Sequence, residues 1–235
     1  MRSIVPILVV SLFISLGIST AVSAQDKNPG KELKAAIDRV DDSTEVITEI
    51  MRITEKSIPR DLLQKSNAVV VFPGALKGGF IVGGQGGKGV AIRRIGKGWS
   101  APAFVNMGGG SVGLQAGGQK TDYVLLIMNE KGLKGLLEDK FEVGGEASAA
   151  AGPVGRTTSA STNVTMDAEI LTYSRSKGLF AGVALKGVVI SQDHSMNQAV
   201  YQKPVRQILG DPPMPAAEAP ATLQKLGNTL ADYMP

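Results

Sequence analysis

Residues 68–94 read AVVVFPGALKGGFIVGGQGGKGVAIRR, and the fold is decided by this stretch and its flanks. Glycine alternates here with valine, isoleucine, phenylalanine and alanine, which predicts short strands that turn sharply and pack backbone to backbone. The apolar runs 68–72, 79–82 and 90–92 argue against a solvated linker. The wider segment from Leu62 to Thr121 holds 16 of the 29 glycines. We therefore expect a glycine-rich β-sheet.

The same segment, Leu62 to Thr121, is strongly basic. It carries seven Lys and Arg residues and no Asp or Glu, a local charge of +7, whereas the whole chain has a formal charge of +4. Such asymmetry predicts one face suited to an anionic partner. The side chains that we single out for contact with an anionic lipid surface are Lys77, Lys88, Arg93, Arg94, Lys97 and Trp99. Trp99 suits the headgroup level of a membrane, although a single tryptophan also suits a core.

The N-terminus, residues 1–24, has the pattern of an export signal. A short basic start is followed by an apolar stretch from Ile4 to Ile18 and by the small residues Val22-Ser23-Ala24. This predicts cleavage near Ala24 and a periplasmic or secreted protein, with an uncleaved anchor as the alternative. The chain has no cysteine, which excludes disulfides and lipoprotein acylation.

Helical periodicity precedes the glycine-rich stretch. Apolar residues spaced three, four or seven apart predict an amphipathic helix over residues 31–55, and a second short helix is expected over 57–63. The acidic balance of residues 31–61 favours packing on the sheet over lying on a membrane. Strands are expected over 99–107 and, as a central strand, 123–128. Asn129 is placed to cap a short helix that ends near Leu137.

The second half of the chain continues the sheet. Small residues over 141–155 predict close backbone packing, the alternation over 163–170 predicts a half-buried antiparallel strand, and 179–190 predicts a long strand hinged at Gly182 and Gly187. Residues 211–220 are expected to form an extended linker before a short terminal helix that docks on the domain. The fold class is α+β, with N-terminal amphipathic helices packed on a glycine-rich, largely antiparallel β-sheet or barrel. The expected divisions are 1–24, 25–203 and 204–235.

Two segments carry a resemblance to a known family. Residues 67–73 (NAVVVFP) with Gly78-Gly79-Phe80, and residues 173–183 (YSRSKGLFAGV), resemble the hallmark segments of the SYLF domain family. The resemblance covers roughly Lys31 to Gln202. It implies lipid binding, with phosphoinositides as ligands of eukaryotic members, some of which also bind actin. For an exported protein it implies a preference for anionic phospholipid.

Other ligands of the basic segment fit the residues poorly. Residues 84–89 (GQGGKG) match the dinucleotide pattern G-x-G-x-x-G, but a strand rather than a helix follows, so we exclude nucleotide binding. These glycines are interpreted as a hairpin turn, or else as a loop that lets Lys88 and backbone N–H groups approach a lipid phosphate. Predicted export and the low aromatic content, 5%, disfavour nucleic acid.

Residues suited to catalysis or metal binding are few. His194 is the single histidine, and Asp193 beside it on an expected strand would point to the opposite face. Asp167 and Glu169 share a strand face that we expect to be solvated, which is unsuited to a paired-carboxylate mechanism. We expect a non-catalytic exported protein without metal or cofactor that binds anionic phospholipid through the basic glycine-rich face. The alternative is a structural protein of the cell envelope that binds an acidic protein or lipopolysaccharide.

Overall fold

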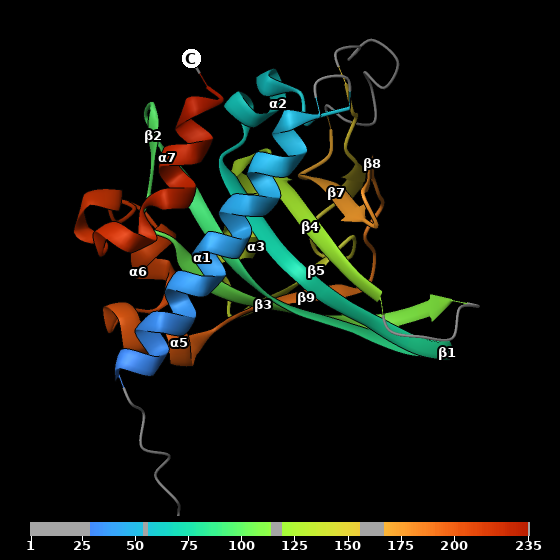
Figure 1. Ribbon diagram of the computed structural model, residues 1–235, viewed down its shortest axis with the longest axis horizontal. Coiled ribbons are helices and arrows are strands. Elements are labelled where there is room, and N and C mark those ends of the chain that lie inside the picture. The colour runs from blue at the N-terminus through green and yellow to red at the C-terminus, as the bar shows by residue number, and fades with distance from the viewer. Residues whose placement is uncertain (1–28, 54–55, 114–118, 156–166, 235) are drawn as a thin grey trace, which may run out of the picture.

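The computed structural model describes residues 29–53, 56–113, 119–155 and 167–234, with the backbone alone at 29, 79–83 and 111–113 (Figure 1). Its centre is a nine-stranded sheet. Seven strands follow the order β5-β9-β3-β1-β4-β7-β6, and the other two, β2 and β8, pair with β1 and β7. The strands are β1 (Ala68–Ile95), β2 (Gly98–Trp99), β3 (Ala103–Gly113), β4 (Gln119–Ile127), β5 (Lys140–Val143), β6 (Ala149–Ala151), β7 (Ile170–Ser176), β8 (Leu179–Gly182) and β9 (Val188–Gln192). Of the pairs between these strands, β6–β7 is parallel and the others are antiparallel, which confirms the predicted α+β class.

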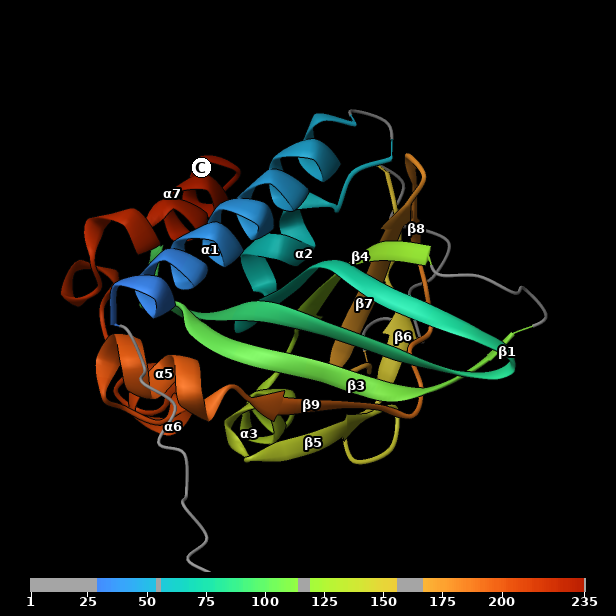
Figure 2. The same ribbon diagram turned by 60° about the horizontal axis from the view of Figure 1, so that its bottom comes forward.

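The sheet curls into a half-barrel, and helices cover it from outside (Figure 2). The longest, α1, lies across the sheet with α7 beside it, and it buries Ala36, Val40, Ile47 and Ile50 in the core. The helices are α1 (Pro29–Arg52), α2 (Arg60–Lys65), α3 (Glu130–Leu137), α5 (His194–Tyr201), α6 (Val205–Leu209) and α7 (Lys225–Asp232), with short 3₁₀ turns η2 (Ala216–Glu218) and η3 (Ala221–Leu223). The expected N-terminal helix is thus confirmed, with its end three residues earlier.

Strand β1 doubles back on itself. Its first part, 68–77, pairs with β4, and its second part, 81–91, pairs with β3. The two parts lie side by side, because the amide of Arg94 donates to the carbonyl of Asn67 at 2.9 Å and Gly89 lies against Phe72. Figure 2 shows them as two long arms that extend away from the helices.

The glycines at 84–89 therefore do not form the predicted hairpin turn. They belong to the returning arm, where Gly84 pairs with Gly110 and Gly89 pairs with Val105. Two of them need to lack a side chain because the first arm lies close: a Cβ on Gly87 would lie 2.8 Å from the Cβ of Ala75, and a Cβ on Gly89 would lie 2.5 Å from the carbonyl oxygen of Val71. The glycines at 84–89 are therefore explained by close contact between the two arms, and the chain does not reverse its direction at these residues.

The central strand and the helix after it follow the prediction. Residues Val124 to Ile127 of β4 are fully buried. The side chain of Asn129 accepts a hydrogen bond of 3.0 Å from the amide of Gly132, which caps α3 as expected. The small residues of 141–155 also pack closely, since a Cβ on Gly152 would overlap the ring of Tyr173.

The strand expected over 179–190 is two strands. β8 pairs with β7, whereas β9 pairs with β3 and β5 in another part of the sheet. The chain leaves β8 after Gly182, whose missing side chain accommodates the carbonyl of Gly152, and it reverses at Gly187, which has a φ of +69°. Most of the strand expected over 163–170 lies outside the described residues.

The C-terminal segment packs into the same core. Leu223, Leu226 and Leu230 are fully buried, and the amide of Ala101 donates to the carbonyl of Met214 at 2.8 Å. The proline-rich segment is thus held against the domain by backbone bonds, and α6 precedes it without having been predicted. The segment 1–24 lies outside the described residues. Among the helices that are described, none combines the length and the apolar character needed to cross a membrane.

Candidate functional site

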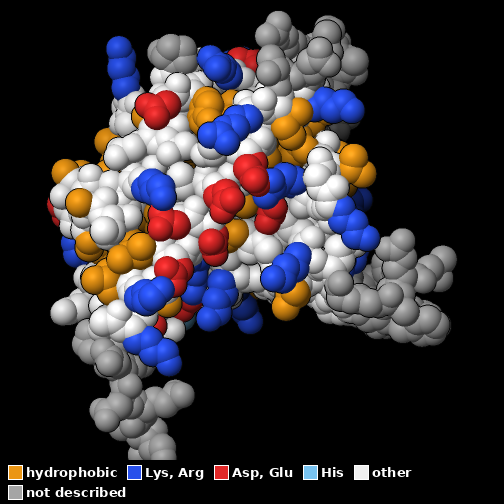
Figure 3. All heavy atoms as spheres, in the orientation of Figure 1, with side chains coloured by type: hydrophobic (Ala, Val, Ile, Leu, Met, Phe, Trp, Pro, Cys, Tyr) orange, Lys and Arg blue, Asp and Glu red, His pale blue; other side chains and the backbone are white. Residues whose placement is uncertain are grey.

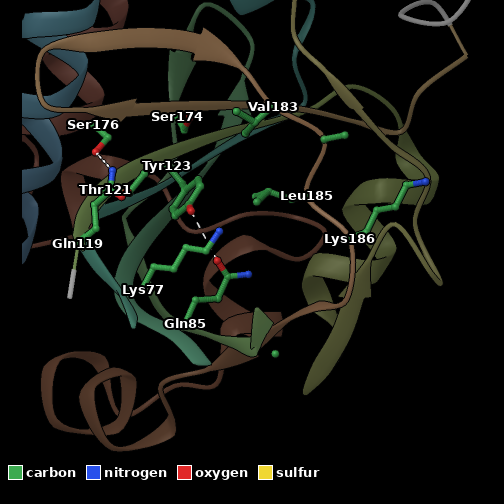
Figure 4. A pocket seen from close by; sticks show the side chains of 12 residues that line it. Lys77, Gln85, Gln119, Thr121, Tyr123, Ser174, Ser176, Val183, Leu185 and Lys186 are labelled. Atoms are coloured by element: carbon green, nitrogen blue, oxygen red, sulfur yellow. Dashed lines mark hydrogen bonds between the residues drawn. The ribbon is translucent and has the colours of Figure 1, made fainter. Parts of the chain in front are cut away.

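The six side chains selected from the sequence fall into two separate groups. Lys77 lies on the first arm of β1, directly beside Gln85 of the returning arm (Figure 4). Lys88 lies three residues after Gln85 on the same returning arm, near Lys77. Arg93, Arg94, Lys97 and Trp99 lie at the far end of that arm, in β1, β2 and the turn between them. Twelve residues of extended chain separate Gln85 from Lys97, which corresponds to roughly 40 Å. The structure therefore does not bring the six into one patch.

The two arginines hold the fold together. Arg93 donates to the carbonyls of Leu209 at 3.1 Å and Gly210 at 2.5 Å, which fastens the end of α6 to the sheet. Arg94 donates to the carbonyls of Ser66 at 2.8 Å and Leu63 at 2.5 Å, at the end of α2. Charge reversal at either arginine would break these bonds, so it would test folding rather than lipid contact.

Trp99 is a core residue, which corrects its interpretation as a side chain at the headgroup level. It is 5% exposed, and the guanidinium of Arg94 lies 4.5 Å from the centre of its ring. A Cβ on Gly227 of α7 would lie 3.4 Å from the Trp99 Cβ, so the terminal helix closes over the indole. The apolar ring is therefore used to dock α7.

The three lysines of the set remain exposed. Lys77, Lys88 and Lys97 all face solvent. In the described part of the chain, none of the three lies within ion-pair distance of a carboxylate. Lys77 differs from the others because exposed leucines and further lysines lie next to it.

These neighbours form what we call the distal rim: Leu76, Lys77, Lys120, Lys177 and Leu179. Leu76 pairs with Lys120 across β1 and β4, and Ser176 of β7 pairs with Leu179 of β8. The Ser176 hydroxyl donates to the carbonyl of Lys120 at 3.3 Å, which joins the two pairs at one end of the sheet. The rim is thus a continuous edge built from β1, β4 and the β7–β8 turn.

The distal rim exposes large apolar side chains. Leu179 is 79% exposed and Leu76 is 58% exposed; among the described residues, the third exposed large apolar side chain is Leu33, at 38%. Leu179 follows a tight turn in which Lys177 has a φ of +50° and Gly178 a φ of +78°. Two successive positive φ values are typical of a two-residue hairpin turn. The turn fixes Leu179 outward instead of leaving it to a loose loop.

A pocket of about 390 Å³ opens beside the rim on the concave side of the sheet (Figure 4). We call it the Lys77 pocket, because the ammonium group of Lys77 points into it beside Gln85 and Tyr123. Val183, Ala184 and Leu185 form an apolar wall, and Lys186 lies at the far edge with its ammonium group directed away. The remaining lining residues are Gly110, Gln119, Thr121, Ser174 and Ser176. No carboxylate is among the described residues that line it.

A second hollow, of about 650 Å³, separates α1 from the sheet; we call it the α1 cleft. Asp42 and Glu45 line its helix side, and Arg175 bridges Glu49 of α1 and Asp122 of β4. Burial, and then neighbouring carboxylates, raise the pKa of Asp42. Figure 3 shows acidic side chains gathered along this face of the molecule over α1. The rim lysines Lys120 and Lys177 also line this cleft. Its four carboxylates thus face three cations, whereas no carboxylate is among the described residues that line the Lys77 pocket.

The residues considered for catalysis are placed apart. His194 begins α5 rather than ending a strand, and Asp193 caps that helix and binds Arg39 at 2.9 Å. Asp167 is exposed, but Glu169 is buried and binds Lys131 and the amide of Ser148, so the expected solvated pair is wrong. No group of three or more His, Asp or Glu side chains within the described ranges is arranged to hold a metal ion.

Sequence reasoning missed most of the distal rim. Lys120 lay inside the basic segment but was not singled out, and Leu179 was expected to begin one long strand over 179–190. The signal available was Lys177-Gly178, a turn dipeptide between two apolar runs. Recognising that turn would have placed Leu179 next to it and shortened the strand to end at Gly182.

The chain is similar to several characterised proteins. A family model described as "Ysc84: Las17-binding protein actin regulator" matches residues 108–233. An SH3 domain-containing protein of Schizosaccharomyces pombe is 34% identical over 71% of this chain and 40% of its own length. LAS seventeen-binding protein 3 of Saccharomyces cerevisiae is 34% identical over 63% of this chain and 33% of its own length.

A human relative extends the comparison to animals. SH3 domain-containing YSC84-like protein 1 is 28% identical over 74% of this chain and 54% of its own length. The chain thus spans about a third to just over half of these relatives. The resemblance drawn from residues 67–80 and 173–183 is confirmed at the level of the family. The chain belongs to the Ysc84 family, whose shared region is the SYLF domain.

Proposed function

We propose that this protein docks on anionic phospholipid membranes through the distal rim. The observation that carries the proposal is Leu179, which is 79% exposed directly after the turn formed by Lys177 and Gly178. Exposed leucines beside unpaired cations suit a surface that is apolar below and negatively charged above. A family that binds lipids and actin supports a binding role rather than catalysis.

The magnitudes favour weak, salt-dependent docking. A lysine near an anionic surface contributes about 1 kcal/mol, and the contribution falls as salt rises. Burial of a leucine contributes about 2 kcal/mol. Lys77, Lys120 and Lys177 with Leu76 and Leu179 therefore suffice to hold a domain on a membrane reversibly. Lys88 and Lys97 lie outside the rim and contribute less.

An acidic protein is the competing partner for the same cations. Lysines alone would suit either partner, since both present negative charge. The two exposed leucines favour the membrane, because they stand apart on β1 and at the start of β8 rather than forming a groove for a peptide. Apolar insertion also predicts residual vesicle binding at high salt, which a purely electrostatic contact lacks.

The experiment is co-flotation with neutral and anionic vesicles across a salt series. A chain that starts at Gln25 keeps every described element, which begin at Pro29. K120Q/K177Q should bind anionic vesicles about 30-fold more weakly, as expected for a loss of about 2 kcal/mol. The matched control K65Q/K97Q makes the same charge change away from the rim and should bind normally. Equal binding by both double variants would reject the rim.

Export belongs to the proposal as well. The pattern of residues 1–24 suggests that the protein meets its membrane in the periplasm or outside the cell. N-terminal sequencing of the protein isolated from an expressing bacterium would test this. A start near Gln25 supports export, whereas an intact Met1 contradicts cleavage.

A further inference from the structure

The Lys77 pocket has features that membrane docking alone does not use. Contact between a lysine and a membrane surface requires no cavity, whereas this pocket has a volume of about 390 Å³. It lies on the concave side of the sheet next to the rim. Gln119 donates to Ser176 across its floor, and Tyr123 lies 3.5 Å from the amide oxygen of Gln85. These contacts bring polar side chains of β1, β4 and β7 together around an open space.

The lining combines three kinds of chemistry. Lys77 supplies a positive charge, which suits one phosphate group. Tyr123, Ser174 and Thr121 supply hydroxyl groups, and the two glutamines supply amides, all of which pair well with hydroxyl groups of a ligand. Burial raises the pKa of Tyr123, so its hydroxyl stays a donor through the physiological range. The apolar wall at Val183 and Leu185 suits the carbon face of such a ligand.

We infer that the Lys77 pocket binds a phosphate group attached to a small molecule with free hydroxyl groups. Lys77 contacts the phosphate, and Tyr123, Ser174 and the glutamines bind the hydroxyls. Because the pocket opens at the rim, the lipid form of this ligand is a hydroxylated headgroup such as phosphatidylglycerol, and this form rests on the proposed docking function. A free glycerol phosphate carries the same chemistry without the membrane.

The test measures both sources on the same variants. Isothermal titration with glycerol 3-phosphate reports the free ligand. Flotation with vesicles that contain phosphatidylglycerol or phosphatidylserine, at equal charge and salt, reports the headgroup. Tyr123→Phe and Ser174→Ala each remove one hydroxyl from the pocket, and Tyr233→Phe removes one from the C-terminal end as a matched control. Thermal unfolding verifies that each variant is folded.

The expected result is a loss of selectivity rather than of docking. The wild type should prefer phosphatidylglycerol over phosphatidylserine, and Tyr123→Phe should weaken that preference about 5-fold, the effect of a hydrogen bond of about 1 kcal/mol. Binding to phosphatidylserine should stay unchanged. Tyr233→Phe should behave as the wild type in both assays.

The other outcomes separate the two proposals. Equal binding of both lipids together with no heat from glycerol 3-phosphate overturns the pocket while the rim stands. Binding of glycerol 3-phosphate without lipid preference supports the pocket and assigns it to a free ligand. If the protein binds no anionic vesicle, docking is rejected. The calorimetric titration with glycerol 3-phosphate then tests by itself whether the pocket binds a phosphate ligand.

Discussion

Arg39 of α1 binds Asp193 at the start of α5 across 2.9 Å, although 154 residues separate them in the chain. Their side chains are 8% and 9% exposed, and the Arg39 guanidinium also lies 5.4 Å from the centre of the Phe104 ring. The pair therefore joins the first helix, the sheet and the C-terminal helices at one buried point. Arg39 was not singled out from the sequence, and Asp193 was considered only as the neighbour of His194.

Arg39→Met should lower the free energy of unfolding by about 3 kcal/mol, because Asp193 is left buried without its cation. The matched control is Lys34→Met on the same helix, which removes the exposed pair with Asp38. That change should shift the free energy of unfolding by no more than about 0.5 kcal/mol. Urea unfolding measures both, and equal effects would contradict the role given to the buried pair.

Asp193 should make the protein sensitive to acid. Burial alone would raise its pKa, but the hydrogen bonds from Arg39, the Met196 amide and the Ser195 hydroxyl hold the pKa below its usual value of 3.8. Its ionised form therefore stabilises the fold above about pH 4, and this stabilisation is lost as the pH falls through the lower folded-state pKa. In urea unfolding, the wild type should lose its advantage over Asp193→Asn as the pH is lowered from 6 to about 3. If the difference in the free energy of unfolding between the wild type and Asp193→Asn did not change with pH, Asp193 would not be ionised in the folded protein.

Gly89→Ala should destabilise the protein by about 1 to 3 kcal/mol, since a methyl group there overlaps the first arm of β1 at Val71 and Phe72. Gly108→Ala is the matched control in β3, where a Cβ meets no atom within 4 Å. It should change the midpoint of thermal unfolding little. Similar shifts for both variants would mean that the arms are not packed as described.

Trp99 offers a direct optical check, because it is the single tryptophan of the chain. Buried under α7, it should emit at short wavelength and resist quenching by acrylamide. Addition of anionic vesicles should leave its spectrum unchanged even when the protein is bound. A blue shift of its emission on vesicle binding would mean that Trp99 contacts the lipid headgroups, contrary to its burial in the core.

The sequence predicted the elements better than their connections. Apolar periodicity predicted α1, and the capping residue Asn129 predicted α3, because both signals depend on residues close together in the sequence. The doubling back of β1 was misplaced, because glycine permits both a turn and a close contact between strands. Which of the two applies depends on Phe72 and Val71, which pack against Gly89 only in the folded sheet.

The sequence predicted the basic charge of the candidate site but not the positions of its side chains in the fold. Composition showed that residues 62–121 are basic, yet Arg93 binds carbonyl groups far beyond this segment, at Leu209 and Gly210, and Arg94 binds carbonyl groups within it, at Leu63 and Ser66. Leu179 reads as an apolar core residue, and its exposure follows from the turn at Lys177 and Gly178. Pairing between distant strands decides these roles, and one sequence does not show it.

The central claim is that Leu179 enters the membrane, and site-specific labelling tests it most directly. The chain has no cysteine, so Leu179→Cys carries a polarity-sensitive fluorophore at one defined position, and Leu33→Cys on α1 is the matched control. On anionic vesicles the label at 179 should shift to the blue and become accessible to a lipid-borne quencher, while the label at 33 should not. A bound protein whose label at 179 remains in water would contradict docking through the distal rim.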